Sequence, residues 1–388
     1  MKRGLIMKIP KIRFPGFTEE WEKQRLSNIL EFEYGMNAAG KEFDGENKYI
    51  RITDIEESSR KFLQTKLVSP EGKITEKYRV KFGDILFART GASTGKTYKY
   101  TNNDGKIYFA GFLIRGRVDK KTSVDFIFCL TLNYKYKSWI NVMSMRSGQP
   151  GINAKEYGSY EFRIPKIEEQ QKIGDFFMLL DKRIEQQEQK IALLKDYKKA
   201  MMQKIFSQEI RFKDQNGNDY PDWEEKKFLN IFFSIPSRAY QIFKTEIFSN
   251  GKIPVVDQGK KKVAGYSNEI KKICDKTPCI VFGDHTTELK YIDFPFIIGA
   301  DGTKILRNHI ANSTLFLYYL LLENNVEQEG YKRHFSILTK KSFDIPMIKE
   351  QEKIASFLST IDFNIEKQEG ILENLKNQKG VLLHKMFI

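Results

Sequence analysis

The stretch of this sequence closest to a catalytic motif is the glycine-rich loop of residues 91–97, Gly-Ala-Ser-Thr-Gly-Lys-Thr. A phosphate-cradling loop needs four residues between its glycines, then Lys and Ser or Thr, and then a helix whose N-terminus faces the phosphates. Only three residues separate Gly91 from Gly95, and the Tyr-Lys-Tyr-Thr-Asn-Asn-Asp that follows has no helical pattern. The loop therefore does not predict ATP binding.

Other groups of reactive side chains are also incomplete. Asp222, Glu225 and Lys226 have the residue types of a metal-dependent nuclease, but they lie almost adjacent in a predicted turn, whereas such cleavage needs carboxylates that converge from separate strands. The four histidines form no triad pattern, and the three cysteines provide neither a disulfide framework nor zinc-ligand spacing. We therefore expect a binding protein that is not an enzyme and holds no metal or cofactor.

A long repeat organises the chain. Residues 164–206 and 345–387 match at 18 of 43 positions when they are aligned without a gap. Each copy carries a stripe at alternating four- and three-residue steps, which is the spacing of a coiled coil. The seam of the first copy is Ile173, Phe177, Leu180, Ile184, Gln187, Ile191 and Leu194, continued by Lys198, Met201 and Ile205. The seam of the second copy is Ile354, Leu358, Ile361, Ile365, Gln368, Leu372 and Leu375, continued by Lys379, Leu382 and Met386.

Two stripes in one chain favour helices that pair with each other, although two separate amphipathic surface helices are the alternative. Gln187 and Gln368 occupy equivalent seam positions, and a polar seam residue lowers stability but fixes register when it finds a partner. At 1.5 Å per residue, the helix from Ile173 to Ile205 would span about 50 Å. Ile-Pro pairs precede both helices and are typical of a helix start.

Composition restricts the choice of partners. A hydrophobic fraction of 40% and an aromatic fraction of 13% indicate globular structure rather than disorder. The net charge of +15 favours nucleic acid or an anionic membrane surface as a partner, unless it is only a general basic character. No lipidation motif or basic amphipathic helix favours the membrane, and the basic N-terminal residues 1–14 lack the pattern of a signal peptide or a spanning segment. We expect a cytoplasmic protein.

Ahead of each long helix lies a block rich in strand patterns. Both blocks open on Arg-Phe followed by Trp-Glu, within residues 13–26 and 211–228, and a Gly/Asn/Asp-rich junction occupies residues 214–222. Strands are expected at 49–55, 85–88 and 106–118 and within 276–291, and short helices at 125–137 and 312–323. The same elements recur in the same order, so we expect two α+β modules, each joined to a long helix.

With these features together, the chain resembles the DNA-specificity subunit of type I restriction–modification systems. The residues that carry the resemblance in the first half are Gly83–Gly91, Ser147–Asn153 and Ile164-Pro165 leading to Glu169-Gln170. In the second half they are Phe282–Thr286, Gly299–Thr303 and Ile345-Pro346 leading to Glu350-Gln351. The resemblance covers nearly the whole chain, and it rests on the order and duplication of these motifs.

The resemblance implies an α+β fold with two globular target-recognition domains, separated by a pair of long antiparallel coiled-coil helices in a pseudo-two-fold internal repeat. The implied segments are a first recognition domain at 1–163, a first long helix at 164–209, a second recognition domain at 210–344 and a second long helix at 345–388. Each domain would read one half of a bipartite site in double-stranded DNA, with the helices as a spacer. The implied partners are two methyltransferase subunits and two restriction/translocase subunits, which would hold the S-adenosylmethionine, ATP and Mg²⁺ that this chain lacks.

DNA contacts are expected in the loops that follow the strands, because polar side chains read base edges and Lys and Arg hold phosphates. The candidates in the first module are Arg51, Arg89, Thr90, Ser93, Thr94, Lys96, Arg146, Gln149 and Asn153. The candidates in the second module are Lys260, Lys261, Lys262, His285, Thr286, Thr287, Lys290, Lys304, Lys332, Arg333 and His334. For each of them the alternative is a solvated loop side chain.

Two rival functions are open at this point. A coiled-coil scaffold or interaction protein without sequence-specific DNA readout would need the same helices. A self-sufficient enzyme would need the motifs that are missing above. Salt-dependent DNA binding separates a reader from a scaffold, because phosphate contacts weaken steeply as salt rises.

Overall fold

The computed structural model of the chain describes residues 9–146, 148–299, 301–309, 312–330 and 332–388. The chain folds into two compact units. The first unit comprises the described residues up to Glu188 together with Gly370–Ile388, and the second unit comprises Gln189–Glu369. Each unit thus includes part of both long helices, whereas the sequence-based division set each helix apart. Ser147, Ala300 and the basic residues 1–8, which entered the sequence interpretation, lie outside the described residues.

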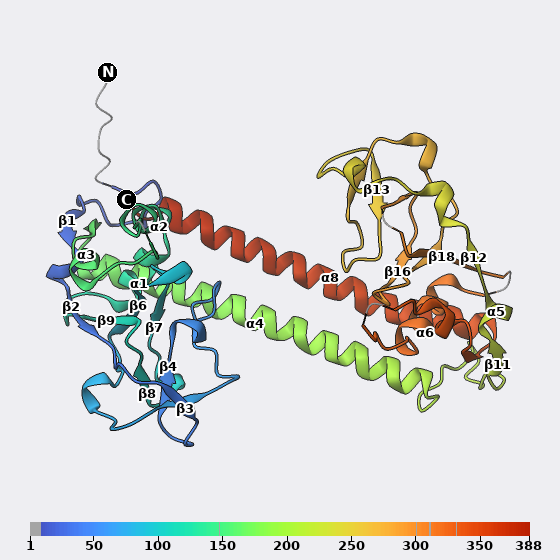
Figure 1. The fold of residues 1–388 in the computed structure, drawn as a ribbon, viewed down its shortest axis with the longest axis horizontal. Helices are drawn as coiled ribbons and strands as arrows, with labels where there is room; N and C mark the ends of the chain where they lie inside the picture. Colours follow the sequence, from blue (N-terminus) through green and yellow to red (C-terminus); the bar gives the residue numbers. More distant parts are fainter. Residues whose placement is uncertain (1–8, 147, 300, 310–311, 331) are drawn as a thin grey trace. The chain divides into compact units, whose positions relative to one another are not determined.

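The first unit is an α+β domain built around a four-stranded antiparallel sheet of order β2-β9-β6-β7 (Figure 1). The strands of this sheet are β2 (Leu30–Tyr34), β6 (Asp84–Ala88), β7 (Thr97–Lys99) and β9 (Leu113–Val118). Paired strands outside it are β1 (Glu22–Arg25) with β10 (Glu161–Ile164), β3 (Gly40–Glu42) with β5 (Val68–Pro70), and β4 (Lys48–Ile50) with β8 (Ile107–Phe109). The short helices are α1 (Val124–Leu132), α2 (Tyr134–Met143) and α3 (Ala154–Gly158).

Two expected elements of the first unit are interrupted by side chains that bond to the backbone. The strand expected at 49–55 ends at Ile50, because the Asp54 carboxylate accepts the Arg51 backbone N–H and starts a 3₁₀ turn over Ile52–Asp54. The helix expected at 125–137 is divided at Asn133, whose side-chain oxygen accepts the Tyr136 N–H and caps α2.

The second unit repeats this architecture. Its four-stranded antiparallel sheet has the order β12-β18-β15-β16, and β11 pairs with β19 as β1 pairs with β10. The strands of the sheet are β12 (Phe232–Ile235), β15 (Cys279–Gly283), β16 (Leu289–Ile292) and β18 (Thr303–Asn308). The remaining elements are β11 (Glu224–Lys227), β13 (Ile253–Val256), β14 (Gly265–Ser267), β17 (Ile297–Ile298), β19 (Ser342–Ile345), α5 (Phe228–Ile231), α6 (Thr314–Glu323) and α7 (Phe335–Leu338). The expected pair of similar α+β modules is confirmed.

The long helices are α4 (Ile167–Phe206) and α8 (Ile348–Lys385), and both begin two residues after the proline of an Ile-Pro pair. Within each unit, part of α4 lies along part of α8 and ion pairs join them. These pairs are Asp181–Lys379 and Glu188–Lys376 in the first unit, and Lys198–Asp362 and Lys195–Glu369 in the second. In both units the residue number rises along one helix as it falls along the other, so the helices run antiparallel. None of the helices in the described ranges is long and apolar enough to cross a membrane.

The seam positions inferred from the sequence are all buried or half-buried in α4 and α8. In the first unit Ile173 and Phe177 belong to a hydrophobic core cluster that includes Phe387. In the second unit Ile354 and Leu358 belong to a cluster that includes Ile205. Gln187 and Gln368 are half-buried. The stripe therefore forms the less exposed face of both helices, as a 3.5-residue period predicts.

An aromatic cluster closes the core of each unit. In the first unit Trp21 lies 5.7 Å from Phe126 and 6.3 Å from Phe387 between ring centroids. The second unit repeats the cluster, with Trp223 lying 6.2 Å from Phe316 and 6.4 Å from Phe206. Phe387 follows α8 and Phe206 ends α4, so each core is completed by the end of the helix that starts in the other unit.

The three cysteines are expected to resist modification in the folded chain. Cys129, Cys274 and Cys279 are buried and unpaired, and burial raises the pKa of Cys129 and of Cys279 to about 12. The reactive species is the thiolate, so these thiols are nearly inert at pH 8. Ellman's reagent should release little colour from the native protein and three equivalents after denaturation; rapid release of one equivalent before denaturation would contradict the burial.

Candidate nucleic-acid interface

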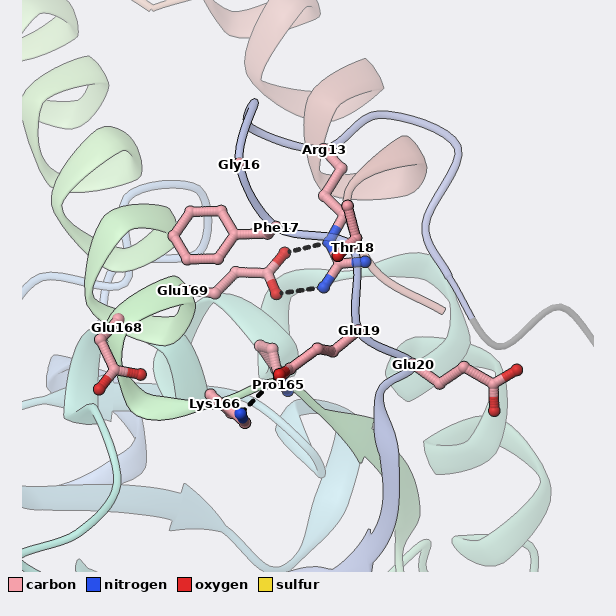
Figure 2. A pocket seen from close by; sticks show the side chains of 10 residues that line it. All are labelled: Arg13, Gly16, Phe17, Thr18, Glu19, Glu20, Pro165, Lys166, Glu168 and Glu169. Atoms are coloured by element: carbon pink, nitrogen blue, oxygen red, sulfur yellow. Dashed lines mark hydrogen bonds and ion pairs between the residues drawn. The ribbon is translucent and has the colours of Figure 1, made fainter.

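A surface pocket of about 230 Å³ lies where residues 13–20, which we call the lead-in of the first unit, pass the start of α4 (Figure 2). The Arg13 guanidinium donates two hydrogen bonds of 2.7 Å to the Glu169 carboxylate, whose side chain is 2% exposed. These hydrogen bonds raise the pKa of Arg13. Lys166 pairs with Glu19 at 2.6 Å in the same pocket. These two ion pairs anchor the lead-in to the start of α4.

The second unit has the same anchor. Arg211 donates to both oxygens of Glu350, at 3.2 and 2.8 Å, and the Trp223 indole N–H donates to the same carboxylate at 3.2 Å. The Glu350 side chain is fully buried. In both units the glutamate comes from the Glu-Gln motif noticed in the sequence, which therefore has a structural role.

The glutamine of each Glu-Gln motif joins the start of a long helix to a short helix. Gln170 accepts the Ser123 backbone N–H at 3.0 Å and donates to the Pro165 carbonyl at 2.8 Å. Gln351 repeats both bonds, accepting from Ser313 at 2.9 Å and donating to the carbonyl of its own Ile-Pro pair at 2.8 Å. Across the described residues no group of three or more His, Cys, Asp or Glu side chains could hold a metal ion.

Two loops of the first unit that the sequence singled out lie together at the end of β6. The Ile152 N–H donates to the Arg89 carbonyl and the Gly91 N–H donates to the Pro150 carbonyl, each at 2.9 Å. Thr90 forms a β-bridge with Gly151. Residues 89–97 and 148–153 thus form one polar surface, which we call the first loop cluster.

Several predicted DNA contacts in or near the first loop cluster are used in ion pairs and hydrogen bonds within the unit. Lys96 is 9% exposed, pairs with Glu57 at 2.6 Å and donates to the Ile55 carbonyl. The remaining structural contacts are Arg51 with Asp54, Arg146 with Glu156, the Thr94 hydroxyl with the Gly91 carbonyl, and the Asn153 side chain with the Glu156 N–H as the cap of α3. Ser93 and Thr90 are half-buried. In this conformation Lys96 in particular is not a free phosphate ligand, because Glu57 neutralises its charge.

Arg89 and Gln149 differ from those candidates. The Arg89 guanidinium lies 5.1 Å from the centre of the Tyr34 ring, and within the described part of the chain no carboxylate pairs with it. Gln149 is exposed, and its amide nitrogen lies beside Gly91. Gly91 has φ = +73°, a conformation that favours glycine. These two side chains present unused hydrogen-bonding groups on the first loop cluster.

The second unit forms a corresponding cluster at the end of β15. The Asp284 N–H donates to the Gly302 carbonyl and the His334 N–H donates to the Asp284 carbonyl. His285 contacts the Lys332 carbonyl through Nδ1 at 3.1 Å, and the Thr286 hydroxyl donates to the Gln258 carbonyl. The predicted loops of this module therefore also lie together. We call the surface formed by residues 284–286, 302 and 332–334 the second loop cluster.

Three predicted contacts of the second module have side chains that the structure places in the interior of the unit rather than on the second loop cluster. His334 is 0% exposed, with Nδ1 at 3.0 Å from the Asp284 carbonyl and Nε2 accepting the Glu329 N–H. Lys290 is 5% exposed and donates to the Asp257 carbonyl at 2.7 Å, and its burial lowers its pKa. Thr287 is 8% exposed, in a left-handed backbone conformation with φ = +57°.

The other cations of the second module remain at the surface. Lys262 contacts Asp293 at 3.6 Å, Lys332 contacts Glu329 at 3.2 Å, and Lys304 lies 5.5 Å from the centre of the Phe335 ring. Among the predicted contacts of this module, the cations that are exposed and have no ion pair with the described residues are Lys260, Lys261 and Arg333. The sequence reasoning missed further exposed residues, namely Arg238, Lys244 and Lys252 in this unit and Tyr34 and Phe112 beside Arg89, because no motif or strand end marked them.

The family model described as the type I restriction modification DNA specificity domain matches residues 18–196 and 220–377. The MjaX specificity subunit of Methanocaldococcus jannaschii is 26% identical over 394 residues, covering 94% of this chain and 92% of that protein. The type I restriction enzyme MjaVIII specificity subunit of the same organism is 24% identical over 405 residues, with the same coverage.

A solved structure gives the same result for the fold. The S subunit of a type I restriction–modification system from M. genitalium superposes with a TM-score of 0.63 at 15% identity, over 98% of this chain and 99% of that one. At that identity the likeness concerns the fold. The two matches of the family model fall on the two halves of the repeat and together cover most of the sequence. The chain belongs to the family of DNA specificity subunits of type I restriction–modification systems.

Proposed function

We propose that this chain recognises a bipartite DNA target and directs partner methyltransferase and restriction subunits to it, each unit reading one half of the target. One observation carries the proposal: two copies of the same sheet end in loop clusters with different side chains. Arg89 follows β6 in the first unit, whereas Asp284 follows β15 at the equivalent place in the second. A shared scaffold with unlike loops suits two readers of unlike sequences.

The long helices are the spacer in this proposal. Helix α4 has its start in the first unit and its end in the second, and α8 has the reverse arrangement. Both helices therefore connect the two readers. We expect a gap of unread base pairs between the half-sites, because neither loop cluster would contact the bases there.

The partners and the division of labour also belong to the proposal. Family membership supports assembly with two methyltransferase and two restriction/translocase subunits on double-stranded DNA. S-adenosylmethionine, ATP and Mg²⁺ would be held by those subunits, and this chain would contribute recognition without catalysis. Its net charge of +15 supports phosphate contacts along the DNA backbone.

Salt dependence tests the proposal. With the methyltransferase partner present, six to ten phosphate contacts would lower the affinity for a target duplex by about 10³–10⁵-fold between 50 and 200 mM salt. Fluorescence anisotropy over this range, with the target taken from the methylation map of cells that carry both subunits, measures the slope. The control is a duplex with both half-sites scrambled, which should bind more weakly at every salt concentration.

The binding measurement separates the reader from the scaffold, and an incubation of the isolated chain tests the enzyme alternative. A coiled-coil scaffold would bind target and scrambled duplexes alike, and the methylation map would then show no sequence that depends on this chain. An enzyme would turn over substrate alone, so incubation of the isolated chain with DNA, Mg²⁺, ATP and S-adenosylmethionine should leave all of them unchanged.

A further inference from the structure

Arg89 has a backbone that is fixed on both sides. It directly follows β6, whose residues Asp84–Ala88 are all buried. Its N–H donates to the Phe112 carbonyl at 3.0 Å, and its carbonyl accepts the Ile152 N–H at 2.9 Å. The side chain therefore leaves the edge of the sheet from a defined point, which a flexible loop residue would lack.

The Arg89 side chain is held by an aromatic ring. The guanidinium lies 5.1 Å from the centre of the Tyr34 ring, and the Tyr34 hydroxyl accepts the Ala154 N–H, at the first residue of α3, at 3.2 Å. A cation–π contact of this kind favours one placement of the guanidinium and occupies none of its N–H groups. Tyr34 is itself tied to a helix start, so it acts as a rigid support.

Arg89 differs from the other arginines predicted to contact DNA in the first unit. Arg51 and Arg146 donate to Asp54 and Glu156, respectively. Within the residues that the structure describes, Arg89 has no carboxylate partner, so its two-pronged donor edge is available. A guanidinium fork that is oriented but unpaired matches the O6 and N7 acceptors of guanine in the major groove.

From this geometry we infer that Arg89 reads a guanine in the half-site of the first unit, with Tyr34 as its positioning residue; the inference rests on the proposed function. The second unit lacks such a reader at the equivalent place. There Asp284 is 3% exposed and its carboxylate accepts the Phe335 N–H at 2.9 Å. The guanine contact inferred for Arg89 therefore has no counterpart at the equivalent place in the second unit.

Arg89→Ala is the decisive variant, because it removes the contact, and Arg89→Lys is its matched partner, because it keeps the charge and removes the fork. The experiment measures dissociation constants of the complex with its methyltransferase partner on duplexes that carry each base pair at every position of both half-sites. The wild-type complex should prefer guanine over the other bases by about 10–100-fold at one position of one half-site. Arg89→Ala should abolish that preference, and Arg89→Lys should weaken it, because Lys still offers a charged donor to O6 and N7 but lacks the rigid fork. Both variants should leave the other half-site unchanged.

Variants of Tyr34 test the positioning role. Tyr34→Phe keeps the ring and should retain most of the discrimination, whereas Tyr34→Leu should lose much of it although Arg89 is still present. The salt slope is a second readout: Arg89→Ala should leave it unchanged, because a base contact releases no phosphate counterion. Circular dichroism of each variant checks that the unit remains folded.

The outcomes are distinct. If Arg89→Ala keeps the wild-type preference at every position, Arg89 does not read a base and the inference is wrong. If Arg89→Ala weakens all sequences equally and reduces the salt slope by about 1, Arg89 is a phosphate contact and the inference is also wrong. A lost preference for a base other than guanine also overturns it. If the wild-type complex itself shows no base preference in either half-site, the proposed function fails instead.

Discussion

Replacing Arg211 with Met is expected to lower the free energy of unfolding of the second unit by about 3–5 kcal/mol, because it leaves a buried carboxylate without its ionic partner. Glu350 is fully buried and receives two hydrogen bonds from Arg211. The measurement is urea-dependent hydrogen exchange followed by mass spectrometry, which reads the two units separately. The double variant Arg211→Met/Glu350→Gln should recover most of the loss, because it removes the buried charge and keeps an acceptor for Trp223.

The control for this prediction is an exposed ion pair of the same unit. Lys195 pairs with Glu369 at 2.6 Å, and the two side chains are 55% and 47% exposed. Lys195→Ala should cost less than about 1 kcal/mol, because solvent screens such a pair. A cost for Arg211→Met no larger than that of Lys195→Ala would show that the buried pair is not what fixes the lead-in.

Placing Asp at Leu375 is expected to cost about 3 kcal/mol or more, because it buries an unpaired charge and removes an apolar side chain. Leu375 is a predicted seam residue on α8 and is 7% exposed. Hydrogen exchange of residues 370–388 should rise strongly. Leu194→Asp makes the same change at the equivalent position of α4, where the side chain is half-buried, and should cost somewhat less.

The matched control lies on the same helix. Val381 is 50% exposed, so Val381→Asp should change the free energy of unfolding by no more than about 0.5 kcal/mol. If the helices set the gap of the DNA target, Leu375→Asp should also broaden the range of gap lengths bound from a library of spaced half-sites, while Val381→Asp should not. Equal behaviour of the two variants would mean that the seam was assigned to the wrong face.

The long helices could be predicted closely from the sequence, because their signal is periodic and local. The 3.5-residue spacing placed Ile173 and Ile354 on buried faces without any knowledge of their neighbours. The duplication also predicted two modules with the same order of elements. Propensity and periodicity act over a few residues, so both survive when a sequence is read without its fold.

The roles of individual polar residues could not be predicted in the same way, because their partners lie far away in the sequence. Lys96 has the position of a phosphate contact, but Glu57 neutralises it from another loop. His334 has the position of a base reader, but its two ring nitrogens are used by the backbone of residues 284 and 329. Tyr34 has no motif at all, and only the fold places its ring under Arg89.

The shared construction of the two cores fixes an order of events during protein synthesis. The second unit is one continuous stretch, Gln189–Glu369, and its core needs nothing that is translated later. The first unit packs Trp21 and Phe126 against Phe387, so its core cannot be completed before Phe387 has been translated. At about 5–20 residues per second, roughly 10–40 s separate the emergence of Glu188 from that of Ile388. The first unit begins translation earlier than the second unit, but its core is therefore completed later.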